Sequence, residues 1–333
     1  MKVEEQPVNL SVVARMFCQK AKTFYHWYKY FLSDYYPDKQ SGKWCSEKIE
    51  VVNKKTGEPE KKPLYVFKSE NLGSNMSIDD KAIGHDGFTI LSNNDSGKIA
   101  LMIETTTAAG VEQAMEKFGS DLQKIKNISM DMSPTYALVF NDLVPNAVHV
   151  IDKFHVMKYV YQSVCDVRTD TVKCLQKQLS KDKKRNEEDK KLLVEIENLR
   201  RISHAITQSP DNWSVEMQQT IDQVFAKHKY LEKAYEISQK FKCWYDYGNR
   251  INSTEKITQD LYNWHKEAMQ ITEFESVVKM IRKHETEIIN FFRHGLTNAK
   301  AERLNGKIQR FVSNNYGVKD KDFFLFRTAK YFS

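Results

Sequence analysis

Cysteine is scarce in this sequence, and the cysteines present form no recognisable pattern. The 333 residues include five cysteines, which are odd in number, widely spaced and never arranged as C-x-x-C. A disulfide framework or a zinc finger requires paired or closely spaced cysteines, so neither is supported. The cysteine usage therefore indicates a reduced, cytosolic protein.

Long apolar runs are also missing. No uninterrupted apolar stretch approaches the roughly 20 residues needed to cross a bilayer. The first residues, MKVEEQPVN, lack the apolar core of a signal peptide. No internal repeat or low-complexity tract is evident. We therefore expect no membrane association and a protein that works in the cytoplasm or on DNA.

The charge balance is mildly basic. Lys and Arg number 51 against 44 Asp and Glu, which gives a formal net charge of +7 and a pI near 8.9. This balance favours a polyanionic partner without establishing one. The apolar fraction of 41% and the length predict a globular chain of two or three domains.

Residues 125–159 contain two short apolar runs that each end at an aspartate. Residues 125–130 end at Asp131, and residues 147–151 end at Asp152, with a predicted helix between the two runs. In open α/β sheets, chemistry is concentrated at the carboxyl ends of strands, so both acids are candidates. Taken singly, each acid is better explained as an ordinary helix-start or loop residue.

The preceding segment adds three strands and a helix. Strands are predicted around residues 76–80, 88–92 and 98–104, followed by a helix capped in the threonine run 105–107. Asp79 and Asp80 fall in the first of these strands. If the first and fourth strands are neighbours, the carboxylates of Asp79 and Asp131 converge.

The N-terminal residues 9–36 predict two short helices that resemble a helix-turn-helix. Lys20, Lys22 and Lys29 lie on or near the second helix, where a DNA-reading helix would meet the groove. Plain packing of two helices explains the same pattern equally well. Residues 37–63 are expected to be a linker or an exposed hairpin.

Helical patterns fill residues 160–286 and return near the C-terminus. The aromatic residues of the first region have helical spacing, which favours core packing over base stacking. A helix that starts near Thr297 has one apolar stripe, and Asn298, Glu302 and Asn305 lie together beside it. The opposite side carries Arg303, Lys307 and Arg310. An ordinary amphipathic helix with an ion-pairing glutamate is the alternative.

Three segments together carry a specific resemblance. They read SIDDKAIG, SMDMSPTYALVFNDLVPNAVHVIDKFHVMK and TNAKAERLNGKIQRFVSNNYGVKDKDFFLFR, in this order. In these segments the chain resembles the DDE transposases of bacterial insertion sequences, and is most similar to the ISL-three group of the RNase H-like superfamily. The resemblance implies a catalytic triad of Asp79, Asp131 and Glu302, which bind the metal.

The same resemblance implies the fold class and its order along the chain. We expect an α/β protein whose RNase H-like core, a mixed five-stranded sheet flanked by helices, is interrupted by an all-helical insertion. The expected domains are a helical N-terminal region and linker at 1–63, the first part of the core at 64–160, the insertion at 161–285 and the last part of the core at 286–333. The long interval between Asp131 and Glu302 leaves room for this insertion.

Further residues receive supporting roles. Asp152 and His155 are similar to a D-x-x-H signature of related transposases, and a structural role is favoured for both. Asp80, Asn298 and Asn305 complete the supporting set. The expected DNA-binding residues are the basic side chains Lys20, Lys22, Lys29, Lys153, Lys158, Arg303, Lys307 and Arg310.

The implied chemistry is metal-dependent phosphoryl transfer on double-stranded DNA. Two Mg²⁺ ions, for which Mn²⁺ would substitute, suit a site of carboxylate oxygens. The expected reaction is cleavage at terminal inverted repeats and strand transfer into target DNA, by a homodimer associated with the nucleoid. A nuclease or resolvase that only hydrolyses DNA, and a decayed transposase that only binds DNA, are the alternatives.

One departure from the family pattern concerns end recognition. Members of this group commonly carry a Cys-rich zinc-binding segment before the helix-turn-helix, and this sequence shows none. Recognition of the ends could be truncated, supplied by a separate polypeptide, or carried by residues 9–36 alone.

Overall fold

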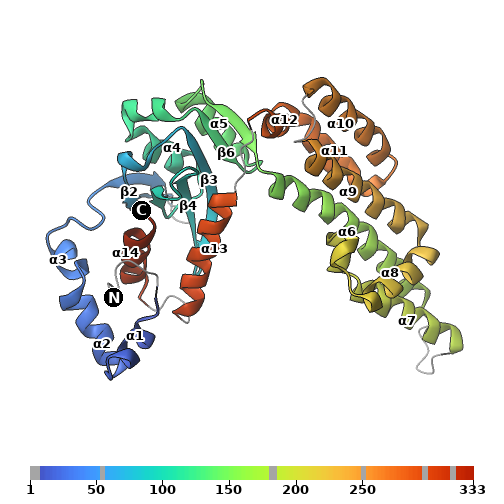
Figure 1. The fold of residues 1–333 in the computed structure, drawn as a ribbon, viewed down its shortest axis with the longest axis horizontal. Helices are drawn as coiled ribbons and strands as arrows, with labels where there is room; N and C mark the ends of the chain where they lie inside the picture. Colours follow the sequence, from blue (N-terminus) through green and yellow to red (C-terminus); the bar gives the residue numbers. More distant parts are fainter. Residues whose placement is uncertain (1–7, 53–56, 180–185, 249–252, 295–298, 316–319) are drawn as a thin grey trace. The chain divides into compact units, whose positions relative to one another are not determined.

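The computed structural model describes residues 8–52, 57–179, 186–248, 253–294, 299–315 and 320–333. The chain divides into two compact units, one made of residues 1–150 with 296–333 and the other of residues 151–295. Figure 1 labels the helices and several of the strands. No helix within the described ranges is long and apolar enough to span a membrane.

A seven-stranded sheet forms the centre of the first unit. Its spatial order is β1-β2-β5-β4-β3-β6-β7. The strands are β1 (Lys48–Val52), β2 (Pro59–Phe67), β3 (Asn75–Ile83), β4 (Asp86–Asn93), β5 (Ile99–Ile103), β6 (Asn127–Met130) and β7 (Val148–Ile151). Strand β3 pairs in antiparallel fashion with β4 and in parallel with β6. The first and fourth of the strands predicted for the core are therefore neighbours.

The number of strands differs from the expected five. The five expected strands are β3 to β7, and the hairpin β1–β2 adds two more by pairing β2 with the edge strand β5. The hairpin buries alternate residues, namely Ile49 and Val51 on β1 and Leu64 and Val66 on β2, while its Lys-rich positions are exposed or partly exposed. This alternation is enough to continue the sheet, since one face of a strand can pack while the other meets solvent.

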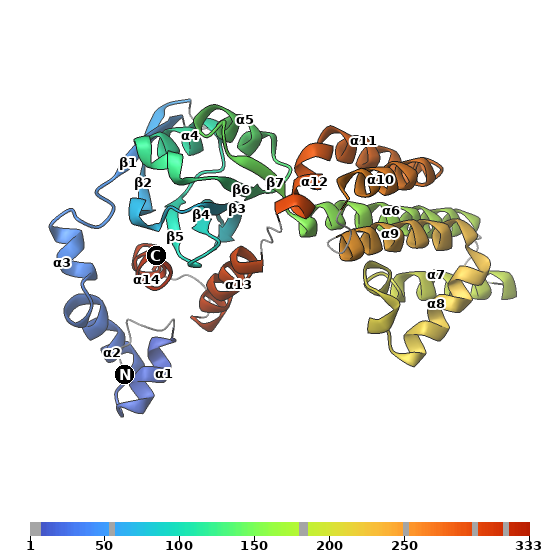
Figure 2. The same ribbon diagram turned by 45° about the horizontal axis from the view of Figure 1, so that its top comes forward.

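Helices cover both faces of the sheet. The helices α4 (Ala108–Glu116) and α5 (Pro134–Leu143) pack on one face, over a core that includes Met76, Ile78, Ile128 and Met130. The helices α13 (Ala299–Asn314) and α14 (Lys321–Phe332) pack on the other face, over Ile83, Phe88 and Ile90. Figure 2 shows this layering of helices on either side of the strands. Successive residues of each central strand thus face different helices.

The N-terminal helices belong to the same unit. They are α1 (Leu10–Met16), α2 (Ala21–Trp27) with a π-helical extension over Tyr28–Leu32, and α3 (Tyr35–Gln40). Their buried residues, such as Phe24 and Tyr28, form one cluster with Phe323 and Phe326 of α14. Trp27 of α2 and Phe31 of the π-helical extension are exposed.

The second unit is mainly helical over its described residues. Its helices are α6 (Lys153–Gln178), α7 (Glu187–Arg201), α8 (Val215–Lys227), α9 (Lys229–Gly248), α10 (Thr254–Ala268), α11 (Glu275–Lys283) and α12 (Glu285–His294). Phe241 and Trp264 are buried with their ring centroids 4.3 Å apart, and Trp244 stacks on Phe241. Many aromatic residues of this unit therefore serve as core, whereas others are exposed, namely Phe154, Tyr159, Tyr230, Tyr247 and Tyr262.

Candidate active site

Asp79 and Asp131 occupy equivalent positions on neighbouring parallel strands. The register pairs Ser77 of β3 with Ser129 of β6. Each acid lies two residues beyond its serine, so the same register places Asp79 beside Asp131 at the carboxyl end of β6. Both are half-buried.

The two acids also face the same side of the sheet. Met76 and Ile78 on β3, and Ile128 and Met130 on β6, point into the core under α4 and α5. Side chains alternate between the two faces along a strand. Asp79 and Asp131 are therefore on the opposite face, which α13 and α14 cover. Pleating and register therefore bring two carboxylates together under α13.

Helix α13 contacts the first of these acids directly. Asn305 Nδ2 donates a hydrogen bond of 2.7 Å to Asp79 Oδ2. Glu302 lies three residues earlier on the same helix, and residues at this spacing share one side of a helix. Glu302 is therefore on the side of α13 that meets β3. Its side chain is exposed.

The apolar stripe of α13 holds the helix on the sheet. Leu304, Ile308 and Phe311 are at most 4% exposed. Phe311 stacks on Phe324 of α14 with ring centroids 4.9 Å apart. The predicted stripe is thus the packed face, and Asn305 stands at its flank.

Asp131 is oriented by the turn that starts α5. Its Oδ1 accepts a hydrogen bond of 2.8 Å from the backbone N–H of Ser133. Pro134 then occupies the first helical position, where its missing N–H leaves no partner unsatisfied. Ser133 stands at the N-cap, but its side chain makes no capping bond.

Asp80 faces away from Asp79, toward α5. Its Oδ1 accepts hydrogen bonds from Thr89 Oγ1 at 2.8 Å and from the hydroxyl of Tyr136. The residue as a whole is exposed, but desolvation on the side that meets Thr89 and Tyr136 raises the pKa of the Asp80 carboxyl; the charge of Asp131 adds to this, while the two hydroxyl bonds oppose it. Nothing in the sequence marks Tyr136 as functional, because it reads as one more apolar position of α5.

A protein-family model described as a transposase, of the DDE type and the ISL-three group, matches residues 76–328. The match starts in β3 and ends in α14, so it includes the strands of both acids and the helix of Glu302. The chain belongs to the ISL-three family of DDE transposases. Searches among curated proteins and solved structures found no match.

The donor set of this transposase suits a divalent cation, although the side chains do not form a closed cage. Asp79, Asp131 and Glu302 offer carboxylate oxygens, the ligand type that Mg²⁺ and Mn²⁺ prefer. Within the described residues, no three His, Cys, Asp or Glu side chains lie close enough to hold one ion. Two of the three expected ligands are thus neighbours by register, and the third is on the helix that packs over them.

Other predicted residues of the transposase belong to the helical unit. Asp152 and His155 stand at the start of α6 in the helical unit, with 3.3 Å between Asp152 Oδ2 and His155 Nδ1. In the same unit Lys153 pairs with Asp246, and Lys158 is exposed. Asn298 lies outside the described residues.

The basic residues differ in their availability. Lys29 pairs with Asp320 at 2.5 Å and its side chain is only 16% exposed, so it ties the π-helical extension of α2 to the start of α14. Lys20 and Lys22 are exposed at the start of α2. The predicted basic side of α13 is open to solvent, with Arg303, Lys307 and Arg310 all exposed.

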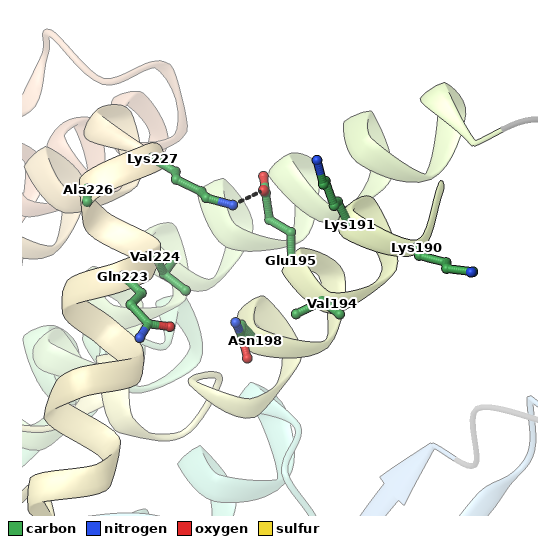
Figure 3. Close-up of a pocket in the computed structure, with 9 residues that line it drawn as sticks. All are labelled: Lys190, Lys191, Val194, Glu195, Asn198, Gln223, Val224, Ala226 and Lys227. Carbon is green, nitrogen blue, oxygen red and sulfur yellow. Dashed lines mark hydrogen bonds and ion pairs between the residues drawn. The ribbon is translucent and has the colours of Figure 1, made fainter. Parts of the chain in front are cut away.

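The helical unit contains a separate cleft between α7 and α8. It has a volume of about 560 Å³ and is shown in Figure 3. Three lysines line it, but Lys227 is neutralised by Glu195 at 2.7 Å. None of its lining residues belongs to the predicted site, and the mixed charge gives no clear ligand.

The hydrogen bond between Asn305 and Asp79 gives a first prediction. In Asn305→Asp a second carboxylate would replace the amide donor beside Asp79, and like charges at this distance repel. We expect cleavage to fall by roughly 10- to 100-fold, the usual effect of losing a partner that orients a metal ligand. Gel-based cleavage assays with Asn305→Ala as the uncharged comparison measure it. Full activity of Asn305→Asp would show that this bond has no part in the site.

Proposed function

We propose that this transposase cuts DNA at the ends of an insertion sequence and joins the freed ends to target DNA through Asp79, Asp131 and Glu302. The observation that carries the proposal is the placement of Asp79 and Asp131 at one level and on one face of adjacent parallel strands. The hydrogen bond from Asn305 to Asp79 also supports the proposal, because it joins α13, the helix of Glu302, to the strand of Asp79.

These three carboxylates are the residues that would hold two Mg²⁺ ions. When bound, such ions stabilise charge on the attacking and leaving oxygens of an in-line displacement. The part of the protein is to keep the carboxylates in place before DNA arrives. The Ser133 amide orients Asp131, the Asn305 amide orients Asp79, and the packed stripe of α13 limits the movement of Glu302.

The proposed reaction has two successive displacements at phosphorus. Water attacks the phosphodiester at the element end, and the 3′-oxygen leaves as a free hydroxyl. That 3′-hydroxyl then attacks a phosphodiester of the target, and a target 3′-oxygen leaves. Neither step needs a covalent protein–DNA intermediate, so no serine or tyrosine nucleophile is assigned. Because two element ends have to be brought together, we propose a homodimer.

The exposed basic side of α13 is proposed to bind DNA phosphates. Replacing Arg303, Lys307 and Arg310 together by alanine is expected to flatten the salt dependence of DNA affinity, with a change in slope of about 0.9 for each phosphate that is no longer neutralised. Binding titrations at several salt concentrations measure this slope. Lys173→Ala, on the exposed surface of the helical unit, is the control. An unchanged slope in the triple variant would remove α13 from the DNA interface.

Strand transfer is the reaction that distinguishes the proposal from its alternatives. Purified protein is incubated with labelled DNA from the inverted repeats that flank the gene, with an unlabelled target and Mg²⁺. Joined products that form with Mg²⁺ and do not form when EDTA is present from the start would support a transposase of this mechanism. Nicked products without joining would indicate hydrolysis alone, and binding without cleavage would indicate a decayed enzyme.

A further inference from the structure

Two buried hydroxyl groups converge on a single oxygen of Asp80. Thr89 is the cross-strand partner of Asp80 on β4, and its Oγ1 lies 2.8 Å from Asp80 Oδ1. The Tyr136 hydroxyl donates to the same oxygen from the first turn of α5. Thr89 and Tyr136 are 0% and 1% exposed. A buried hydroxyl that loses its partner is costly, so this network strongly favours one arrangement.

The hydrogen atoms of these groups define what Asp80 contributes. Tyr136 has one proton to donate, and Asp80 Oδ1 accepts it. The Thr89 hydroxyl also has one proton, and it lies within reach of both Asp80 Oδ1 and the backbone oxygen of Thr105, at 2.7 Å from the latter. The role of Asp80 here is therefore to accept hydrogen bonds, which an asparagine carbonyl could also do.

This network links the two halves of the proposed site. Asp80 follows Asp79 on β3, and Tyr136 follows Asp131 by five residues on α5. The Tyr136–Asp80 bond therefore ties the start of α5, whose turn orients Asp131, to the strand position next to Asp79. We propose that Asp80 is a positioning residue, and that with Tyr136 and Thr89 it fixes the spacing of the two metal-binding aspartates.

The pleat of β3 separates this role from that of a metal ligand. Asp79 faces α13 and contacts Asn305, whereas Asp80 faces α5 and contacts Tyr136. Two consecutive strand residues cannot both point to one face. The proposal rests on the proposed function, because it assumes that Asp79 and Asp131 bind the metal.

Mn²⁺ binding to the full-length protein tests the proposal without depending on activity. Free Mn²⁺ is counted by electron paramagnetic resonance for wild type, Tyr136→Phe, Thr89→Val, Asp80→Ala and Asp80→Asn, and end cleavage is measured in parallel. We expect Tyr136→Phe and Asp80→Ala to weaken Mn²⁺ binding and cleavage by about 10-fold or more, as removal of supporting hydrogen bonds does at metal sites. Thr89→Val should act in the same direction. Asp80→Asn keeps a side-chain oxygen that can accept these hydrogen bonds, so it should retain most of the Mn²⁺ affinity that Asp80→Ala loses.

Matched controls separate positioning from general damage. Tyr65→Phe removes another tyrosine–carboxylate bond, to Glu104 at 3.2 Å, on a strand separated from β3 by β5 and β4. It should leave Mn²⁺ affinity unchanged. Thermal unfolding shows whether each variant is folded, and Thr89→Val tests the network independently should Tyr136→Phe fail to fold.

The outcomes are distinct. Normal Mn²⁺ affinity in folded Tyr136→Phe and Thr89→Val would overturn the positioning role. If Asp80→Asn bound Mn²⁺ as weakly as Asp80→Ala, the positioning role would also be overturned. The site would then need the negative charge of Asp80 and not its hydrogen-bond acceptor. If Asp131→Asn also binds Mn²⁺ like wild type, the proposed site itself fails.

Discussion

Replacement of Asp131 by asparagine is expected to lower strand cleavage at least about 1,000-fold while DNA affinity stays within roughly twofold, because charge stabilisation by bound metal ions supplies several kcal/mol at the transition state. Asparagine keeps the side-chain shape, and its Oδ1 can still accept the hydrogen bond that the backbone N–H of Ser133 now donates to Asp131. The start of α5 should therefore fold normally. What is lost is the negative charge that holds a hard cation.

The measurement pairs a cleavage assay with a binding assay on the same labelled end. Asp142→Asn is the matched control, since Asp142 is an exposed acid on the same helix, α5. Glu302→Gln should reproduce the loss of cleavage if α13 supplies the third carboxylate. Cleavage retained in Asp131→Asn would refute the proposed triad, whereas loss of DNA binding would move Asp131 to the DNA interface.

The strands of the core could be predicted because their apolar runs are short, continuous and bounded by turn residues. The run before Asp131 corresponds to β6, and the run before Asp152 corresponds to β7. The condition attached to Asp79, that its strand neighbours the strand of Asp131, is met by the β3–β6 pairing. The stripe on α13 was also predictable, because a period of 3.6 residues is visible without tertiary information.

Other features depend on tertiary interactions that no local pattern records. The bond from Tyr136 to Asp80 joins an apolar-looking helix position to a strand acid, and alternation alone decides that Asp80 and Asp79 face different helices. The sequence places Lys29 among the candidates for DNA binding, but a residue far along the chain, Asp320, pairs with its charge. Ion pairs of this kind become visible only when the fold is known.

Truncation of Phe311 to alanine is expected to destabilise the first unit by about 3–5 kcal/mol, the usual cost of removing a fully buried phenylalanine ring. Phe311 is 1% exposed, stacks on Phe324 and lies under the guanidinium of Arg327, 4.8 Å from its ring centroid. A loss of this size is a large share of the roughly 5–15 kcal/mol that stabilises a typical domain. Hydrogen exchange of amides in residues 299–315 measures the loss, because a chain of two units need not unfold in one transition.

The same substitution connects stability to chemistry, because the stripe that buries Phe311 also holds Asn305 against Asp79. Opening of α13 would remove Glu302 and Asn305 together, so cleavage should fall in proportion to the closed population of the helix. Lys307→Ala, exposed one turn earlier on α13, should change stability by no more than about 0.5 kcal/mol. If Phe311→Ala lost cleavage with normal exchange protection, the ring would be acting on DNA instead of on the fold, and the attachment of α13 would need another explanation.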